Sequence, residues 1–566
     1  MIDLVYVTYN SEKWIENCIK SIVKSDYDKK EIHIVIVDNA SIDKTRSILE
    51  EMKRRYENLF GEIEIVQNVK NEGFGRANNI GFKRCVSDIV CFINIDTELA
   101  EDAFKQLEQE IADSDEKTAL WEFRQYPFEH PKIYDPLTGE TGWASGAAFA
   151  VRRKVFEEVN GFDERIFLYV EDVDLSWRIR WAGYRLKYVP NVKIIHYSYE
   201  NGVTLKMDQY VYGVINNILL RYRYGTFRDI CWGHLIFFRE ILHQEVMAGA
   251  KKKLVLEYIR HYKKIFHFFQ HGKYKKNRGE FFPSFIHTDY SINRQGAFYK
   301  SSMFDSSSDF DKKPLVSILV RTCQRPEVLR ESLLSIQKQT YKNLEVIVVE
   351  DGENCAEEMI RTEFSKLKIH YLATGTKVGR SKAGNIAMQK ASGKYLNFLD
   401  DDDLFFADHV EVLAAALEHS EKKAAYAIGL ETSIVVESKK PYQYQIKTSR
   451  TAYQQGFDRV MLCHHNYIPI QCMMFQKELF LSYGGLDESV DALEDWDLWV
   501  RYSMYTDFIF VEKTTSVYRV PYEKSISQIR QKQLDDALAG MREKHKSYKQ
   551  LIDVKTIAEL YEKTIM

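Results

Sequence analysis

Acidic side chains follow apolar, β-branched runs at matching places in two distant parts of this chain. The first part has IHIVIVD ending at Asp38 and VCFINID ending at Asp96. The second has LEVIVVED ending at Asp351 and YLNFLDDDD ending in residues 400–403. Such runs are predicted to be buried parallel strands. Ligands of parallel α/β sheets bind beyond the carboxyl ends of the strands, so we expect these carboxylates to face two clefts.

Two of these acids are placed to recognise a nucleoside. Asp38 and Asp351 are predicted to accept hydrogen bonds from a base or ribose. Thr8, Asn10 and Thr322 are expected to line the same clefts. The alternative is that each acid only caps the following helix or turn.

Two loops combine glycine, a basic residue and asparagine where a helix is expected to begin, namely NEGFGRANNIGF (71–82) and KVGRSKAGNIAM (377–388). Backbone amides at a helix N-terminus bind phosphate oxygens, so these loops are predicted to bind a diphosphate. The candidate residues are Gly73, Arg76, Asn79, Gly379, Arg380 and Asn385. Ordinary capped loops are the alternative. Neither loop has G-x-G-x-x-G after a first strand, which disfavours a nicotinamide-dependent dehydrogenase.

The four consecutive carboxylates at 400–403 are costly unless they are solvated or neutralised, and we favour neutralisation by a divalent cation. In the first part the same place reads Asn94-Ile95-Asp96-Thr97, with one strong ligand. Hard oxygen ligands are typical of Mg²⁺ or Mn²⁺ shared with substrate phosphates, and not of zinc. A solvated acidic turn is the alternative at both places.

A glutamate-aspartate pair opens a predicted helix in each part, and its second member is Asp172 or Asp495. A helix N-terminus favours the ionised carboxylate, which suits a general base. The alternative is a simple N-cap.

These residues belong to two copies of one pattern of alternating strands and helices. Asp38 follows Thr8 by 30 residues, and Asp351 follows Thr322 by 29, which indicates that the copies match nearly residue for residue. A second matched block follows in each copy, at 160–184 and 484–505. The alternation predicts an α/β fold with an open, mostly parallel sheet in each copy.

Composition describes a multidomain globular chain. Its 566 residues are 45% hydrophobic and 28% charged, with a net charge of -3, so no overall field attracts nucleic acid. The eight cysteines form no C-x-x-C pair, which indicates reduced, buried thiols and a cytoplasmic protein. We expect neither a signal peptide nor a membrane span.

The ordered motifs resemble the inverting glycosyltransferases of family 2, which have the GT-A (Rossmann-like) fold, here twice in one chain. The resemblance covers about 1–225 and about 314–520. In the first copy VTYNS, VDNAS, NEGFGRANNIG, INIDTE, WASGAAFAVRR and NGFDERIFLYVEDVDL are similar to the rhamnosyltransferase-type branch. In the second, VRTCQRPEVL, VVEDG, VGRSKAGNIA, FLDDDD and LEDWDLWVR are similar to the wider family.

The resemblance implies roles for the candidate residues. Catalytic bases would be Asp172 and Asp495. A divalent cation, Mn²⁺ or Mg²⁺, would be bound by Asp96, His196 and Asp402. The nucleotide-sugar donor, with UDP or dTDP, would be bound by Thr8, Asn10, Asp38, Gly73, Arg76, Asn79, Asn94, Thr322, Arg325, Asp351, Gly379, Arg380, Asn385 and Asp400. The second copy departs from the pattern, because no histidine occurs between His465 and His545.

Four regions are predicted: a first GT-A domain (1–225), a helical connector and linker (226–313), a second GT-A domain (314–522) and a C-terminal helical tail (523–566). Within the connector, residues 251–278 contain ten lysines or arginines and one acid. Leu254, Tyr258, Tyr262, Ile265, Phe266 and Phe269 recur there at helical spacing. We expect this stripe to pack on a catalytic domain; peripheral contact with the anionic inner face of a membrane is the alternative.

The main hypothesis is a metal-dependent bifunctional glycosyltransferase that extends a glycan or lipid-linked glycan acceptor in bacterial surface polysaccharide synthesis. The second hypothesis keeps one active copy and makes the other, the copy without the histidine, a glycan-binding or scaffolding module. A third, a nucleotidyltransferase, would release pyrophosphate instead of a nucleoside diphosphate, and the paired glutamate-aspartate blocks count against it.

Overall fold

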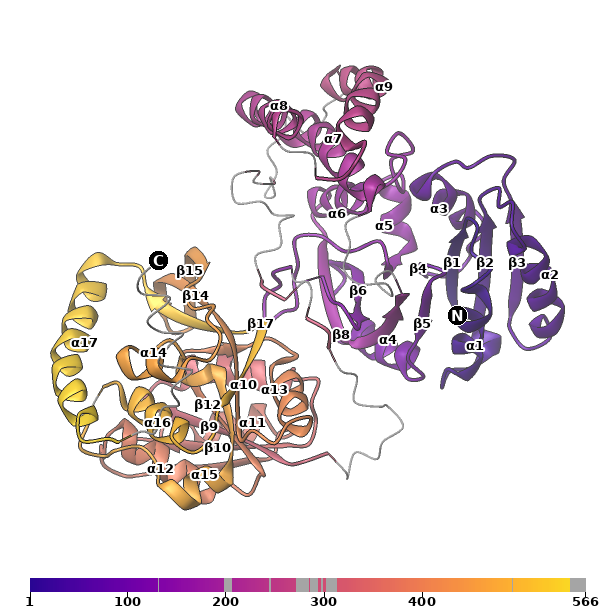
Figure 1. Cartoon of the computed structure of the whole chain (residues 1–566). Helices are drawn as coiled ribbons and strands as arrows, with labels where there is room; N and C mark the ends of the chain where they lie inside the picture. Colours follow the sequence, from indigo (N-terminus) through magenta and orange to yellow (C-terminus); the bar gives the residue numbers. More distant parts are fainter. Residues whose placement is uncertain are drawn as a thin grey trace. The chain divides into compact units, whose positions relative to one another are not determined.

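The computed structural model describes residues 1–130, 132–197, 206–243, 246–270, 283, 285, 294–296, 299–301, 313–490 and 492–549. The chain divides into two compact units, Met1–Asn293 and Arg294–Met566, and each is described by itself (Figure 1). Arg294, inside the region predicted as connector and linker (226–313), belongs to the second unit, where its guanidinium donates to the Thr514 carbonyl oxygen at 2.9 Å.

The described part of unit 1 contains one eight-stranded sheet in the order β3-β2-β1-β4-β7-β6-β8-β5. The strands are β1 Ile2–Thr8, β2 Ile32–Asp38, β3 Glu62–Gln67, β4 Ile89–Ile93, β5 Thr97–Leu99, β6 Thr118–Tyr126, β7 Ala148–Arg152 and β8 Arg185–His196. The first four strands in this order are parallel. β7 is antiparallel to both β4 and β6, and β5 is antiparallel to β8, so the sheet is mixed where a mostly parallel one was expected.

Helices cover both faces of this sheet, which explains why its inner strands read as unbroken apolar runs. The helices around the sheet are α1 Ile15–Lys24, α2 Thr45–Tyr56, α3 Phe74–Phe82, α4 Ala103–Ala112, α5 Arg153–Glu158 and α6 Glu171–Trp181. Leu4 and Tyr6 of β1 pack with α1, α2 and α4 on one face. Val5, the residue between them, packs with α3, α5 and α6 on the other.

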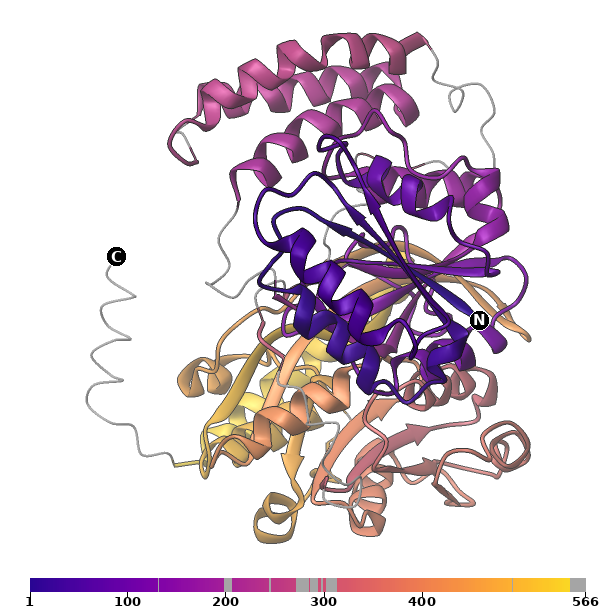
Figure 2. The ribbon, with the colours of Figure 1, turned by 90° about the vertical axis from the view of Figure 1, so that its right-hand side faces the viewer.

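Three further helices, α7 Met207–Tyr224, α8 Phe227–Leu242 and α9 Ala250–Gln270, form a bundle beside the sheet of unit 1 (Figure 2). Their common core contains Ile215, Leu219, Phe237, Leu254 and Ile265. Within the described residues, no helix is long and apolar enough to cross a membrane.

Unit 2 repeats this sheet strand for strand in its described residues. The order β11-β10-β9-β12-β16-β14-β17-β13 has the topology of unit 1, and β15 is added beside β14. The strands are β9 Val316–Thr322, β10 Leu344–Glu350, β11 Ile369–Ala373, β12 Tyr395–Asp400, β13 Leu404–Phe405, β14 Ala424–Lys439, β15 Tyr442–Thr451, β16 Met473–Gln476 and β17 Phe508–Pro521. The duplication predicted from sequence is therefore a duplication of a whole mixed sheet.

Helices also cover both faces of the second sheet. They are α10 Pro326–Gln337, α11 Glu357–Glu363, α12 Arg380–Lys390, α13 His409–Glu418, α14 Arg459–His464, α15 Lys477–Tyr483, α16 Glu494–Ser503 and α17 Lys524–His545. One face packs against α10, α11 and α13, and the other against α12, α14, α15, α16 and the last part of α17.

All eight cysteines are free thiols. Four of them, Cys18, Cys85, Cys91 and Cys472, are buried as expected, whereas Cys231 and Cys355 are exposed.

Candidate active sites

The two predicted bases begin equivalent helices. The residue before α6, Val170, and the residue before α16, Leu493, both have left-handed backbone conformations, with φ of 74° and 63°. Such angles are unfavourable for branched or bulky side chains, so the surrounding packing must impose them. The turn places Asp172 and Asp495 in the first helical turn of α6 and α16.

Backbone and amide donors hold each base carboxylate. Asp172 accepts hydrogen bonds from the Val173 and Gly146 backbone N–H groups, both at 2.8 Å. Asp495 accepts from the Trp496 N–H at 2.8 Å and from the Asn466 side-chain amide at 3.0 Å. The side chains are therefore oriented before any ligand arrives.

Burial makes both carboxylates more basic than an ordinary aspartate. It raises the pKa of Asp172, against the opposing effects of the Gly146 and Val173 N–H groups and of Lys132. Burial, together with the neighbouring Glu494 carboxylate, raises the pKa of Asp495 to about 7. A base with a pKa near neutrality is well matched to proton abstraction at physiological pH.

A buried lysine near the first base was missed by the sequence analysis. Lys132 pairs with Glu122 and donates to the Trp143 carbonyl oxygen at 2.5 Å. Burial holds the pKa of Lys132 well below its usual range, and the Asp172 carboxylate opposes this shift. No sequence motif pointed to Lys132, because it lies in the long connection between β6 and β7.

The predicted metal pair of the first copy lies together. His196 Nε2 is 3.4 Å from Asp96 Oδ1, because β8 places His196 opposite Thr97 of β5. The Gln125 side-chain oxygen lies 2.8 Å from Nδ1 and fixes the ring. Burial raises the pKa of Asp96, but its contacts with His196 outweigh burial and leave the pKa lowered. An ionised carboxylate beside an imidazole is a donor set suited to a divalent cation.

Arginines neutralise part of the acidic loop of the second copy, a source of charge that the sequence analysis missed; a cation at residues 400–403 stays a prediction. Arg321 forms a two-point contact with Asp400 at 2.8 and 2.9 Å. Arg325 pairs with Asp401 and, at 3.3 Å, with Asp402. Position 321 is a strand residue in an apolar run, and its equivalent in the first copy is Val7.

Most predicted residues of the second copy line one cavity of about 1210 Å³. They are Thr322, Arg325, Asp351, Arg380, Asp400, Asp402 and Asp495. The lining also includes Arg321, Glu494 and residues of α17, such as Leu534 and Met541. The cavity is large enough for a nucleotide sugar, whose sites commonly have several hundred cubic ångströms.

Strand register corrects the alignment of the two copies by one residue. Thr8 lies opposite Asp38, whereas Thr322 lies opposite Glu350. The residues that follow, Asn39 and Asp351, both donate their backbone N–H to the threonine carbonyl oxygen at 2.8 Å. Glu350 is therefore the equivalent of Asp38, and Asp351 is the equivalent of Asn39, because the second copy has a shorter connection.

The equivalent residues Asn39 and Asp351, which follow β2 and β10, accept hydrogen bonds from the glycine-containing loops. Asn39 accepts from the Glu72 N–H at 2.9 Å, and Asp351 accepts from the Gly379 N–H at 3.1 Å. Gly73 and Gly379 both have positive φ, at 85° and 96°, directly before α3 and α12. A Cβ atom on Gly73 would lie 2.5 Å from the Phe167 carbonyl oxygen. Both loops therefore start a helix as predicted, and diphosphate binding by them stays a prediction.

The side-chain amides of Asn79 and Asn385 each donate one hydrogen bond to the backbone and accept another from it. Asn79 donates to the Phe162 carbonyl oxygen and accepts from the Phe162 N–H, both at 2.9 Å. Asn385 does the same with Leu486, at 2.9 and 2.8 Å. They fix the segment that leads to α6 or α16, so the structure gives them a positioning role; the donor contact predicted for them stays a prediction.

The remaining candidates surround these groups. Asn94 follows β4 and donates its N–H to the Ala147 carbonyl oxygen at 2.8 Å. The Asn10 side chain accepts from the Ile42 N–H at 3.0 Å. Arg76 pairs with Glu72 at 3.1 Å, and Arg380 lies 4.0 Å from Glu494. Thr8 and Asp38 are in contact at 3.4 Å.

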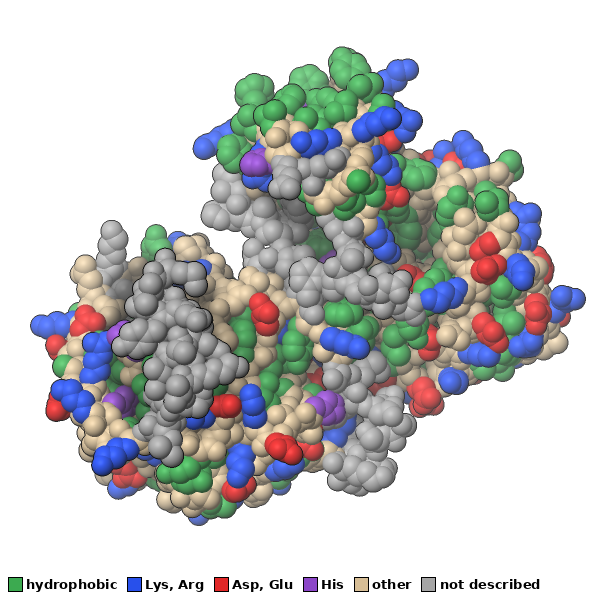
Figure 3. Space-filling view, viewed as in Figure 1, with side chains coloured by type: hydrophobic (Ala, Val, Ile, Leu, Met, Phe, Trp, Pro, Cys, Tyr) green, Lys and Arg blue, Asp and Glu red, His purple; other side chains and the backbone are tan. Residues whose placement is uncertain are grey.

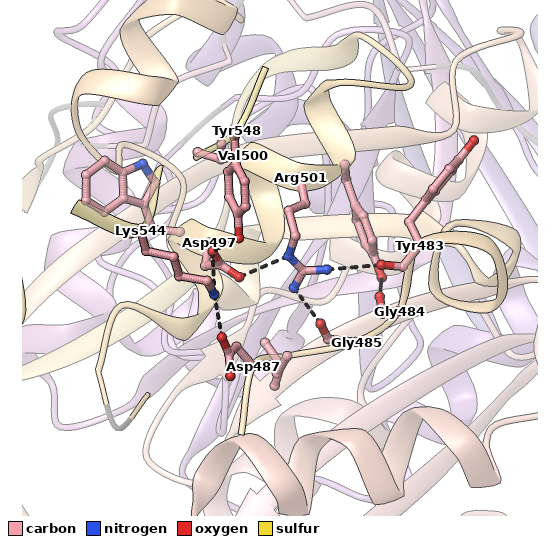
Figure 4. Close-up of polar contacts among 12 residues, drawn as sticks. Tyr483, Gly484, Gly485, Asp487, Asp497, Val500, Arg501, Lys544 and Tyr548 are labelled. Carbon is pink, nitrogen blue, oxygen red and sulfur yellow. Dashed lines mark hydrogen bonds and ion pairs between the residues drawn. The ribbon is translucent and has the colours of Figure 1, made fainter. Parts of the chain in front are cut away.

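The third acid of each E-D-x-D sequence is a buried hub, which the sequence analysis missed. Asp497 contacts Arg501 at 3.0 Å, Lys544 at 2.8 Å and the Tyr548 hydroxyl at 2.8 Å (Figure 4). Lys544 also contacts Asp487 at 2.6 Å. Burial raises the pKa of Asp497, but His545, 3.5 Å away, together with Lys544, Arg501 and Tyr548, outweighs burial and holds the pKa well below its usual range. The hub thus joins α17 to the helix that carries the base.

Unit 1 has the same hub. Asp174 contacts Arg178 at 2.8 Å, Arg223 at 2.6 Å and the Tyr224 hydroxyl at 2.9 Å. Arg223 also contacts Asp163 at 2.9 Å. The last turn of α7 is therefore the equivalent of the end of α17. The signal in the sequence was the repeated E-D-x-D, together with a cation and a tyrosine almost the same distance downstream.

Each unit thus defines a nucleotide-diphospho-sugar transferase domain of the GT-A type, with an aspartate at a helix start and acids at the strand ends. The model of glycosyl transferase family 2 matches residues 3–160 and 317–481, together more than half of the chain. The chain belongs to glycosyl transferase family 2, as a tandem of two such domains.

Known relatives are similar over single regions. An uncharacterised glycosyltransferase of Rickettsia typhi is 28% identical over 200 residues, which are 35% of this chain and 61% of the relative. The N-acetylglucosaminyl-diphospho-decaprenol L-rhamnosyltransferase of Mycobacterium tuberculosis is 46% identical over 64 residues, 11% of this chain and 21% of that protein. The first match spans less than two thirds of the relative.

Two solved structures are also similar. The S. aureus TarS 1–349 structure shows 18% identity, covers 46% of this chain and 72% of its own, and has a TM-score of 0.31. The mannosyltransferase PcManGT from Pyrobaculum calidifontis, in complex with GDP-Man and Mn²⁺, is 17% identical, with a TM-score of 0.33. The match covers 48% of this chain and 84% of the PcManGT chain.

Proposed function

We propose that this protein is a bifunctional, inverting glycosyltransferase whose two domains each transfer a sugar from a UDP- or dTDP-linked donor to a growing glycan. The observation that carries the proposal is that both units place an aspartate with a raised pKa, Asp172 or Asp495, at the start of a helix. In each unit an equivalent buried aspartate, Asp174 or Asp497, holds that helix. Two domains with equivalent bases in one chain favour two transfers over one. Synthesis of a bacterial surface polysaccharide, on a free or lipid-linked acceptor, is the setting we propose.

The chain's own residues supply the steps of a single displacement. Asp172 or Asp495 removes the proton of the acceptor hydroxyl while the hydroxyl oxygen attacks the anomeric carbon of the donor sugar. The bond to the diphosphate breaks, and negative charge develops on the leaving phosphate. In the second domain Arg380, which lines the cavity, would offset that charge, because Arg321 and Arg325 are paired with acids of residues 400–402. The attack and the departure occur on opposite faces, so the configuration inverts.

A divalent cation fits the first domain better than the second. Asp96 and His196 would hold it, and it would supply charge stabilisation for the diphosphate. Within the described residues no cluster of three or more His, Cys, Asp or Glu side chains is arranged to hold a metal, so substrate oxygens would complete the coordination. In the second domain the carboxylates of Asp400 and Asp401 are occupied by arginines, and the metal role of Asp402 stays a prediction.

Removing the metal is therefore expected to affect the two domains unequally. We expect His196→Ala to weaken Mn²⁺ binding about 10-fold or more, and chelation to abolish transfer by the first domain. Mn²⁺ binding by calorimetry and transfer in the presence of EDTA measure these effects. His419→Ala, an exposed histidine of unit 2, is the control. Unchanged Mn²⁺ affinity in His196→Ala would refute the first metal site.

Transfer by the second domain is expected to depend on pH through the base. Because the pKa of Asp495 is about 7, its ionised fraction, and with it kcat/KM, should rise about 10-fold per pH unit below 7 and level off above it. The pH profile of nucleoside diphosphate release measures this. Asp401, whose pKa burial also raises to about 7, is the control: Asp401→Asn should keep the rising limb.

A second candidate function makes unit 2 a glycan-binding module. The arginine contacts of Asp400 and Asp401 and the missing counterpart of His196 favour it. Under this candidate only unit 1 would turn over a donor. The equivalent base and hub in unit 2 favour catalysis instead.

The proposal is tested by incubating the full chain with a panel of sugar nucleotides, Mn²⁺ and a mixed oligosaccharide acceptor pool. Two donors that release nucleoside diphosphate only with acceptor support two active domains. Release of pyrophosphate would identify a nucleotidyltransferase and end the proposal.

A further inference from the structure

Helix α9 carries two apolar stripes, and the bundle uses only one of them. Leu254, Ile265 and Phe268 are buried in the core shared with α7 and α8. The second stripe, Val255, Ile259, Tyr262, Phe266 and Phe269, repeats every three or four residues and is 41–68% exposed. The predicted stripe therefore splits. Leu254 and Ile265 are buried in the bundle core, and Tyr258 packs against it. Phe269 meets the Tyr222 ring of α7 but is 57% exposed, and Tyr262 and Phe266 are also exposed.

The neighbouring helix exposes a matching stripe. Trp232, Leu235, Phe238 and Leu242 of α8 are 53–83% exposed. The two helices are joined by stacking of Phe237 on Tyr258, with ring centroids 4.4 Å apart. Figure 3 shows hydrophobic side chains gathered over α8 and α9 at the top of the view, with lysines and arginines around them. We call these nine residues the α8–α9 face; a continuous exposed apolar surface of this kind marks an interaction site.

The charges around the α8–α9 face are mainly positive. The two helices contain eight lysines or arginines and three acids. The acids are engaged: Glu257 is buried and contacts Arg260 at 2.6 Å, Glu240 accepts from the Tyr210 hydroxyl, and Asp229 closes a helix cap. Among the cations, Arg228, Lys252 and Lys263 are exposed. An apolar face with a cationic rim is typical of helices that lie in the interface of an anionic bilayer.

We propose that the α8–α9 face docks the protein on an anionic lipid bilayer. A second copy of the chain suits the face less well, because pairing two such faces would bring their cationic rims together. Docking would also position the first domain, since α7 joins the bundle to Asp174 on the helix that carries Asp172. A lipid-linked acceptor, which rests on the proposed function, would then be presented to a domain held at the surface.

The test is flotation of the full chain with vesicles of phosphatidylglycerol and phosphatidylethanolamine, compared with phosphatidylcholine vesicles. We expect binding to the anionic vesicles only. Trp232→Ser/Ile259→Ser/Phe266→Ser should weaken binding about 100-fold or more, because three large apolar side chains no longer insert. Arg228→Gln/Lys252→Gln/Lys263→Gln should weaken it about 100-fold, at about 1 kcal/mol for each cation.

The matched control is Val69→Ser/Val86→Ser/Leu481→Ser, which removes three apolar side chains that are 62–101% exposed and belong to none of the bundle helices α7, α8 and α9. It should bind vesicles like the wild type.

Circular dichroism and donor turnover with a soluble acceptor should be unchanged in all variants, so a failed vesicle experiment is distinguishable from a failed glycosyltransferase proposal. Absence of anionic selectivity, or equal losses in the control, would overturn the inference. Failure of the wild type to float with anionic vesicles would also overturn it. In that case sedimentation would show whether the chain is a dimer in which a second copy covers the α8–α9 face.

Discussion

Replacing either base by asparagine is expected to abolish the use of one donor and leave the other. Asp172→Asn and Asp495→Asn keep an oxygen that can accept the backbone N–H bonds at 2.8 Å, so the turns before α6 and α16 should persist. The amide cannot take up a proton, and loss of general base catalysis typically costs about 10²- to 10⁴-fold in rate. We therefore expect a loss of this size in kcat for one donor per variant.

The measurement is nucleoside diphosphate release from each donor by the wild type and both variants. Exposed carboxylates provide matched controls, and Asp113→Asn in unit 1 and Asp535→Asn in unit 2 should leave both activities intact. If Asp495→Asn changes nothing while Asp172→Asn removes all turnover, unit 2 is a binding module. If neither variant loses activity, the assignment of the bases is wrong.

Removal of the buried hub is expected to have the largest effect on stability. Asp497→Ala would leave Arg501 and Lys544 without their shared carboxylate, and removing one partner of a buried ion pair typically costs about 3–5 kcal/mol. Tyr548→Phe removes one hydrogen bond and should cost about 1 kcal/mol. Hydrogen exchange of α16 and α17, with urea denaturation of unit 2, measures these losses.

The pH dependence gives the hub prediction a second test. Because the pKa of Asp497 is lowered in the folded protein, its stabilisation is present above the ordinary aspartate pKa of about 4 and is lost as the pH falls through the lowered value. The deficit of Asp497→Ala should therefore be full at pH 7 and shrink at more acidic pH. Asp535→Asn should change stability by about 0.5 kcal/mol or less. A small, pH-independent effect of Asp497→Ala would contradict the role of the hub.

The duplication, the family and the helix starts that carry Asp172 and Asp495 could be predicted from the sequence because each depends on short, local patterns. Apolar runs that end in Asp38 or Asp96 fix where strands stop, and E-D pairs fix where α6 and α16 start. The proximity of Asp96 and His196 also followed, since the resemblance assigned both residues to the same cation. The alignment of Asp38 with Asp351 failed, because spacing along the chain does not report the register in which strands pair.

What the sequence determined by itself is the kind of fold, its repetition and the residue types at the ends of its strands. Only the tertiary structure decided which charges meet. Arg321 looked like part of an apolar strand, yet it neutralises Asp400. The charge of Lys132, in the connection between β6 and β7, opposes the rise in the pKa of Asp172. Likewise, helical periodicity placed two apolar stripes on α9 without telling which one is buried. Partner choice depends on contacts between segments far apart in the chain, whereas strand and helix ends depend on neighbours a few residues away.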